Sequence, residues 1–241
     1  MNTPRYLVLA ALAIGLLGLR AADGRVFWRR PAARGRAVLE TAPGWMTLQS
    51  GPVQINDGRG SLDVVGCGEP LDAVAARLQA AYAGPGPLEI VRQTESLLLA
   101  RAAENGRAVT LLALAPGAAD TTVLFVLSQT PEEAARSARP PAAPRLAEPP
   151  PFPGSRAQAH IGTEAGRAQV EIYAAESPPA AVLAHYEQAL AARAWVRVDP
   201  AGRGEGLALF QKGRELCGLL ALPADGGGCT ITVLHKRLNM E

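Results

Sequence analysis

The sequence predicts an α+β protein with two tandem β-α-β-β-β units, each one helix packed on an antiparallel sheet, after an N-terminal apolar helix. Three observations predict this class. The same order of sequence patterns occurs twice along the chain, and each copy contains one stretch with apolar residues at helical spacing. Each copy also ends in short apolar stretches that are separated by turn residues, which is typical of an antiparallel meander.

The repeat is seen in two pairs of segments that align without gaps. GRGSLDVVGCGEPLDAVAARLQAAYA from Gly58 matches GRAQVEIYAAESPPAAVLAHYEQALA from Gly166. Further along, GRAVTLLALAPGAADTTVLFVL from Gly106 matches GRELCGLLALPADGGGCTITVL from Gly213. Identity between the copies is low, so the order of strand, corner, helix and strands carries the prediction more than matching letters do.

Each copy contains one helix whose apolar residues form a single stripe, which predicts a surface helix with one buried face. In the second copy, Ser177 is expected to be the N-cap and Pro178 the first helical residue. The stripe residues are Leu71, Val74, Ala75, Leu78, Ala81 and Tyr82 in the first copy, and Val182, Tyr186, Ala189 and Leu190 in the second.

The strands after each helix are separated by Asn105-Gly106 in the first copy and by Lys212-Gly213 in the second. Short extra strands around Val53 to Ile55 and Ala157 to Ile161 are expected to lengthen the two sheets. The predicted organisation is a signal anchor or signal peptide at 1–22, an arginine-rich juxtamembrane segment at 23–44, a first repeat at 45–129, a proline-rich linker at 130–154 and a second repeat at 155–241.

The linker begins with Thr130, Pro131 and Glu133, which can start a short helix. Glu132 and Glu133 then place favourable charge near the helix N-terminus. The proline-rich remainder favours polyproline II and indicates a semi-rigid spacer, which would not fix the relative orientation of the two repeats.

The N-terminus carries the prediction of localisation. The run from Tyr6 to Leu19 has no charge, and its length of about 14 residues suits a signal peptide, although with its flanks it approaches a thin membrane span. We expect an uncleaved anchor in the inner membrane, single-pass, with the body in the periplasm. Two alternatives stay open: a cytoplasmic body, which the arginines between Arg20 and Arg36 favour, or secretion after cleavage.

No catalytic, cofactor-binding or metal-binding residue is predicted. Gly66 and Gly68 form a G-x-G corner between a strand and a helix, but Leu71 occupies the place of the third glycine in a dinucleotide fingerprint. The repeat builds the same corner without glycines, so this corner is interpreted as a bend. Asp63 and Glu171 occupy corresponding places in the two copies and are expected on the solvent side of their strands.

The cysteines Cys67, Cys217 and Cys229 are odd in number and form no C-x-x-C pair, so buried small apolar residues are expected in preference to a disulfide or a reactive thiol. The second and third lie in a predicted hairpin around PADGGG, far from directly opposite each other. The histidines His160, His185 and His235 have no metal-ligand spacing, and the second is expected at the edge of an apolar stripe.

The segment SPPAAVLAHYEQALAARAW, from Ser177 to Trp195, resembles a helix module of bacterial envelope proteins with the pattern aromatic-Tyr-x-x-x-Leu-x-x-x-Gly-Trp. His185 stands at the aromatic place and Ala194 at the glycine place; the first copy lacks the tryptophan. The resemblance implies a non-catalytic envelope role. In outline, the duplicated units are also similar to the paired domains of an accessory lipoprotein of the outer-membrane assembly machinery, but this chain lacks the lipid-bearing cysteine.

These observations predict a non-catalytic, membrane-anchored bacterial envelope protein that serves as a protein-interaction or scaffold component. Its expected partners are the membrane, through Tyr6 to Leu19, and another envelope protein that binds exposed sheet faces or edge strands. A formal net charge of +2 and the lack of a basic stripe with aromatic residues disfavour nucleic acid. The alternative is a small-molecule-binding protein or enzyme with a cleft between the two domains.

Overall fold

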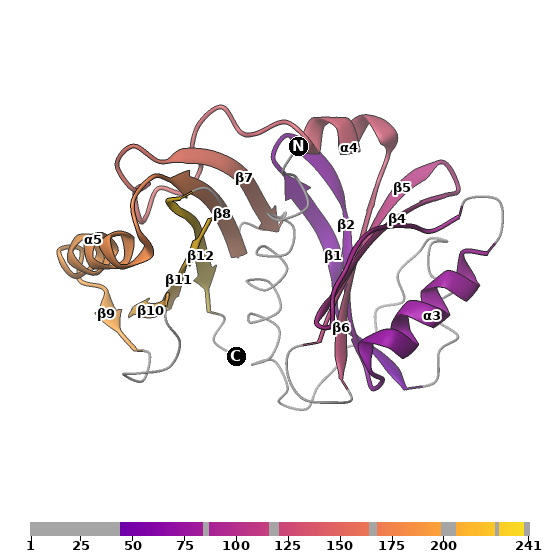
Figure 1. Ribbon diagram of the computed structural model, residues 1–241. Coiled ribbons are helices and arrows are strands. Elements are labelled where there is room, and N and C mark those ends of the chain that lie inside the picture. The colour runs from indigo at the N-terminus through magenta and orange to yellow at the C-terminus, as the bar shows by residue number, and fades with distance from the viewer. Residues whose placement is uncertain are drawn as a thin grey trace. The chain divides into compact units, whose positions relative to one another are not determined.

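The computed structural model describes residues 44–83, 87–115, 121–163, 168–198, 206–224 and 227–238. These residues form two compact units, which Figure 1 shows with their helices and strands labelled. The N-terminal unit comprises residues 44–53 and Gly58–Arg136. The C-terminal unit comprises Gln54–Asp57 together with residues 137–238, so the end of the first strand belongs to the second unit.

The elements of the first half of the chain are β1 (Trp45–Ile55), β2 (Gly58–Cys67), α3 (Leu71–Ala81), β3 (Glu89–Gln93), β4 (Leu97–Glu104), β5 (Arg107–Leu114), β6 (Thr122–Gln129) and α4 (Pro131–Ser137). The strand order is β3-β4-β5-β6-β2-β1, and the pairs from β3 through to β2 are antiparallel. The tight turn between β4 and β5 places both Asn105 and Gly106 at positive φ, as a two-residue hairpin turn requires.

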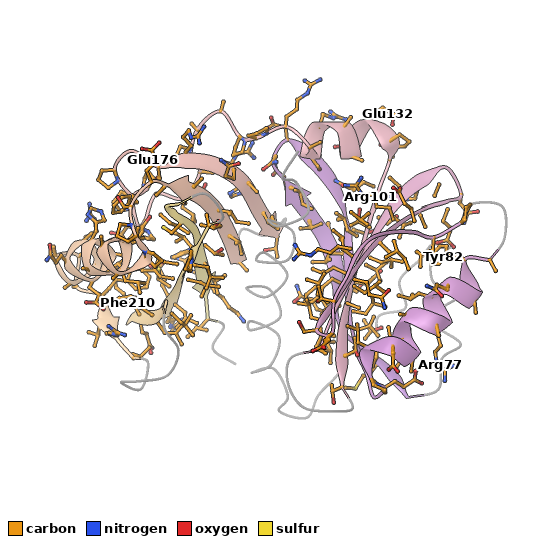
Figure 2. All side chains as sticks on the ribbon, viewed as in Figure 1. Arg77, Tyr82, Arg101, Glu132, Glu176 and Phe210 are labelled. Carbon is orange, nitrogen blue, oxygen red and sulfur yellow. The ribbon has the colours of Figure 1, made fainter. Side chains whose placement is uncertain are left out.

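Helix α3 packs its apolar stripe on one face of this sheet. Leu71, Val74, Ala75 and Leu78 are its buried residues, and they meet alternate residues of β2, β4, β5 and β6. Just after the helix, the Tyr82 hydroxyl donates a hydrogen bond of 3.3 Å to Glu104. Figure 2 labels Tyr82 at this end of α3. The core of the N-terminal unit therefore lies between α3 and the sheet.

The elements of the second half are β7 (Arg156–Thr163), β8 (Ala168–Ala175), α5 (Pro179–Ala191), β9 (Val196–Arg197), β10 (Leu207–Lys212), β11 (Glu215–Pro223) and β12 (Cys229–Arg237). The strand order is β7-β8-β12-β11-β10-β9, with every pair antiparallel. Val182, Tyr186 and Leu190 of α5 are fully buried against β8, β10, β11 and β12. The spacing of the predicted apolar stripe is confirmed by these contacts.

The predicted fold class is wrong. The described residues are 53% strand and 18% helix, with twelve strands and three helices, so antiparallel sheet dominates over the expected tandem β-α-β-β-β arrangement. Each sheet contains six strands because a full strand precedes β2 and β8, and because a short strand, β3 or β9, follows each long helix. The prediction placed β1 and β7 only as short extra strands around Val53 to Ile55 and Ala157 to Ile161, and it missed β3 and β9, the second of which has only two residues.

Two smaller predictions have opposite outcomes. The predicted cap of α5 is shifted by one residue, because Pro178 is the N-cap and Pro179 is the first helical residue. The prediction for the cysteines is confirmed: Cys67, Cys217 and Cys229 are all buried and free. The register of β11 and β12 sets Cys217 opposite His235 and Cys229 opposite Pro223, far from each other along the hairpin.

The predicted inner-membrane, single-pass localisation is also corrected. Among the residues that the structure describes, no helix is both long enough and apolar enough to cross a membrane. The segment from Tyr6 to Leu19, on which the prediction and its periplasmic orientation rested, lies outside the described residues, as do residues 20–43.

Candidate functional site

A buried polar cluster lies at the start of the C-terminal unit. The register of β7 and β8 places His160 directly opposite Glu171, and Tyr173 follows two residues later on the same face of β8. Only 7% of the His160 side chain and 2% of the Glu171 side chain are exposed. The Tyr173 hydroxyl donates a hydrogen bond to Glu171 Oε2, and His160 Nδ1 lies 3.3 Å from Oε1, where poor alignment leaves it without a full hydrogen bond.

The carboxylate of Glu171 is held by a segment outside the sheet. The backbone N–H groups of Arg145 and Leu146 both donate hydrogen bonds to Oε1, the second at 3.1 Å. Burial alone raises the pKa of Glu171, but the contacts with His160 and Tyr173 and the two backbone N–H groups outweigh burial and lower this pKa below its usual value. Glu171 is therefore a stabilised anion that fastens Arg145 and Leu146 to the sheet.

The cluster continues to Asn56, at the end of β1. The backbone N–H of Asn56 donates to the His160 carbonyl oxygen at 2.7 Å, and its side-chain oxygen accepts from the His160 N–H at 2.8 Å. Its side-chain nitrogen donates to the Ser137 carbonyl at 2.7 Å. Asn56 has a φ of 51°, a left-handed conformation that asparagine tolerates better than most residues do. It joins the end of β1 to β7 and to Ser137.

The residues from Arg145 to Phe152, which we call the strap, lie on the C-terminal unit without helix or strand, and the backbone bends at residues 147–149. The Arg145 guanidinium forms an ion pair with Asp57, and Leu146 enters the core beside α5 and the sheet. At the other end, the Phe152 ring meets His185 of α5 edge-on, with ring centroids 5.1 Å apart. The strap is thus fixed at both ends by the same unit.

The middle of the strap is fixed through Glu148. Its Oε2 accepts hydrogen bonds from Trp195 Nε1 at 3.3 Å and from Lys212 Nζ at 3.2 Å, and its Oε1 lies 3.8 Å from Arg193 Nε. Lys212 Nζ lies 5.8 Å from the centre of the Trp195 ring, within cation–π distance. Desolvation opposes the ionised form, but the hydrogen bonds from Lys212 and Trp195 lower the pKa of Glu148.

We call the groups that hold the strap the strap site. They are Glu171 from β8, His185 from α5, Trp195 after α5, and Lys212 from β10. These residues come from separate parts of one packed unit. Glu171 and His185 contact the two ends of the strap, and Trp195 and Lys212 both contact Glu148 in its middle. The strap site offers the strap four kinds of contact: a carboxylate for backbone N–H groups, a buried place for Leu146, a cationic and indole donor pair for an acid, and a ring for Phe152.

The predicted exterior position of Glu171 is wrong. Val170 and Ile172 are buried on one face of β8, and Glu171 and Tyr173 are buried on the other, so neither face of this strand is solvent-exposed. Its counterpart Asp63 lies in β2 and is partly buried. The strap contacts were missed altogether, although Leu146 and Phe152 are the only large apolar residues between Ser137 and Gly154 and could have signalled anchoring.

The other predicted residues are placed as follows. His185 lies at the edge of the α5 stripe as expected, between the rings of Phe152 and Tyr186. His235 Nε2 lies 3.8 Å from Glu215 Oε2, and the register places His235 opposite Gln169 of β8 and not opposite Glu171. Thr130 caps α4, because its hydroxyl accepts a hydrogen bond of 3.3 Å from the Glu133 N–H. Within the described ranges, no three His, Cys, Asp or Glu side chains are placed to hold a metal ion.

The edge strands β9 and β3 carry exposed apolar side chains. On β9, the outermost strand of the C-terminal sheet, Val196 is 65% exposed, and Val198 just beyond it is 45% exposed. Arg197 pairs with Phe210, which packs in the core under α5, so Val196 and Val198 point away from α5. On the other edge, Ile90 of β3 is 38% exposed.

No protein-family model matches the sequence, and neither the comparison with curated proteins nor that with solved structures finds a similar protein.

Proposed function

We propose that the protein is a non-catalytic protein-interaction or scaffold component that binds an extended segment of a partner protein at an edge strand. The observation that carries this proposal is the exposure of Val196 and Val198 at the outer edge of the C-terminal sheet. An edge strand offers backbone groups to a further strand, and exposed apolar side chains add contact area to that pairing.

The two edges differ in how far they are protected. The β3 edge has the charged residues Glu89 and Arg92, and its register shifts between Ile90 and Arg92, both of which are features that discourage edge pairing. On β9, the one charged residue is Arg197, whose side chain is turned to Glu187 of α5 in an ion pair. We therefore assign partner binding to β9, where a partner strand would pair with only a few residues and would depend on contacts with Val196 and Val198.

The polar cluster favours this function over an enzyme. A general base needs a carboxylate or an imidazole that a substrate can reach, but Glu171 and His160 are 2% and 7% exposed, and Glu171 accepts hydrogen bonds from three donors. The same contacts hold two strands and the strap together. Their geometry supports a structural role within a binding protein.

A photo-crosslinking experiment tests the proposal. A photoreactive phenylalanine analogue replaces Val196 in the full chain, which is then produced in its native host. The matched control carries the analogue at Met46, which is 57% exposed and lies in the other unit. We expect a defined partner to be crosslinked at position 196 and not at 46. We also expect Val198→Asp to lower the yield about tenfold, because it places a charge in an apolar contact. Equal yields at both positions, or no effect of Val198→Asp, would refute the proposal.

A further inference from the structure

The strap makes contacts of the kind that a bound peptide makes. Its first anchor is the pair of backbone N–H groups at Arg145 and Leu146 on the Glu171 carboxylate, and its second is the Leu146 side chain in the core. Its third is the Glu148 carboxylate on Trp195 and Lys212. Backbone contacts recognise an extended chain whatever its sequence, whereas the side-chain anchors select particular residues.

We propose that the strap site is a binding site for proline-rich segments with the pattern Leu-x-Glu-Pro-Pro-Pro-Phe, and that the chain fills this site with its own residues from Leu146 to Phe152. The occupant we assign in trans is a partner segment with the same chemistry: an apolar residue, an acid two positions later, and an aromatic residue four positions after the acid. This inference rests on the proposed protein-binding function but concerns a different surface from β9.

Two physical arguments support recognition in trans. Prolines fix φ at their own positions, so the free segment has less backbone entropy to lose when it binds. The backbone positions of Glu171, His185 and Lys212 are set by β8, α5 and β10 and not by the strap. A detached segment of the same sequence can therefore make the same contacts.

The covalent connection explains why the chain's own strap occupies the site. A short tether gives the strap an effective concentration of about millimolar, so a free segment competes poorly until the strap is weakened. The test therefore uses the full chain with the double substitution L146A/F152A, which removes the apolar and aromatic anchors. The probe is a fluorescently labelled synthetic peptide of residues 143–154, and fluorescence anisotropy measures its binding.

We expect the peptide to bind the L146A/F152A chain at least about tenfold more tightly than the unmodified chain. A peptide carrying Glu148→Lys should bind the same variant at least about tenfold more weakly. Adding Lys212→Glu to the chain should weaken binding of the original peptide and partly restore binding of the Glu148→Lys peptide. This charge exchange assigns binding to the strap site, since adsorption elsewhere would not follow the pair.

Hydrogen exchange of residues 143–152 shows whether the strap has been released, and circular dichroism shows whether the chain is folded. If L146A/F152A does not fold, the chain variant Glu148→Lys takes its place, because this residue is partly exposed and its substitution removes only the acidic anchor. A folded variant with a released strap and no peptide binding overturns the proposal. Unchanged protection of the strap in L146A/F152A also overturns it, because these side chains would then not be anchors.

The outcome is independent of the edge-strand test. The peptide experiment uses a defined probe and does not involve Val196 or Val198, so its failure leaves the proposed function standing. Conversely, a failure of crosslinking at Val196 leaves the strap site to be judged by the peptide alone.

Discussion

The substitution Glu171→Gln tests whether the ionised Glu171 carboxylate holds the strap on the sheet. The glutamine amide is nearly the same size as the carboxylate, so packing is preserved and only the charge and one acceptor are lost. Its oxygen can still accept from the N–H groups of Arg145 and Leu146, while its NH₂ group replaces the acceptor that Tyr173 uses. We expect the strap to be held less firmly, because both of its hydrogen bonds to Glu171 lose an ionised partner.

The magnitude follows from the two hydrogen bonds that join Glu171 to the strap. A hydrogen bond to a charged group contributes about 1.5–3 kcal/mol, and a neutral one contributes about 0.5–1.5 kcal/mol, so each contact loses about 1 kcal/mol. The amide costs less to bury than the carboxylate does, which offsets part of this loss. We expect the free energy of strap opening to fall by about 1–2 kcal/mol at pH 7, which corresponds to about 5- to 30-fold faster amide exchange.

The sign of the pH dependence is fixed by the lowered pKa of Glu171. A carboxyl group whose pKa is lower in the folded state contributes stability that is complete above its unfolded pKa, ordinarily about 4.5, and that is lost as the pH falls through the folded pKa. The difference between the unmodified chain and Glu171→Gln should therefore be complete at pH 7 and should shrink below about pH 4.5.

Hydrogen exchange with mass spectrometry measures this effect, with protection factors corrected for the intrinsic rate at each pH. The peptide that contains Arg145 and Leu146 should lose protection, while a peptide from β5 in the N-terminal unit should not change. The control substitution Glu187→Gln removes an exposed charge that pairs with Arg197, and we expect at most about 0.5 kcal/mol from it. A loss in Glu171→Gln no larger than in this control, or one independent of pH, would refute the assigned role.

Three further substitutions or treatments test the packing. Leu146→Ala should lower the free energy of unfolding of the C-terminal unit by about 2–4 kcal/mol in urea denaturation, because it leaves a cavity in the core. The control Leu48→Ala, at a residue 41% exposed, should cost about 0.5 kcal/mol or less. Similar losses in the two variants would contradict the burial of Leu146. Gly228→Ala should destabilise the chain by more than about 2 kcal/mol, because its Cβ would overlap the Ala175 carbonyl oxygen. The control Gly227→Ala, also at positive φ but in open space, should cost about 1 kcal/mol in the same assay. Equal costs would refute the close packing of Gly228 against the Ala175 carbonyl. Burial raises the pKa of the Cys67 and Cys217 thiols to about 12, so at pH 8 only about one in ten thousand is a thiolate. Iodoacetamide should then modify neither cysteine before the chain is unfolded, and rapid modification of the native chain would contradict this.

The sequence predicted the features that depend on local periodicity. The stripes of α3 and α5 have the helical spacing of one buried face, and both helices occur where the stripes lie. The hairpin of β11 and β12 follows from the Gly-rich turn between two apolar stretches. The two-residue strand β9 could not be predicted, because Val196 and Arg197 become a strand only through pairing with β10, a contact that local sequence does not encode.

Glu171 was misplaced because the alternation rule assumes that one face of a strand meets water. In β8 both faces are buried, so the acid that separates Val170 and Ile172 lies inside the unit and needs donors. Those donors come from the strap, more than twenty residues earlier in the chain. A strand pattern alone therefore cannot distinguish an exposed acid from a buried one that is satisfied by a distant segment.

The proline-rich region shows that composition does not decide between a spacer and a bound segment. Prolines restrict the backbone in both cases, and residues 142–145 are exposed, as a spacer would be. From Leu146 onward, the segment has side chains that are buried or paired. Leu146 reaches the core, Glu148 reaches Trp195 and Lys212, and Phe152 reaches His185. A stiff segment loses little conformational entropy when it is ordered, so these three anchors are sufficient to hold the strap. Removing the anchoring side chains, and not replacing the prolines, should therefore release it.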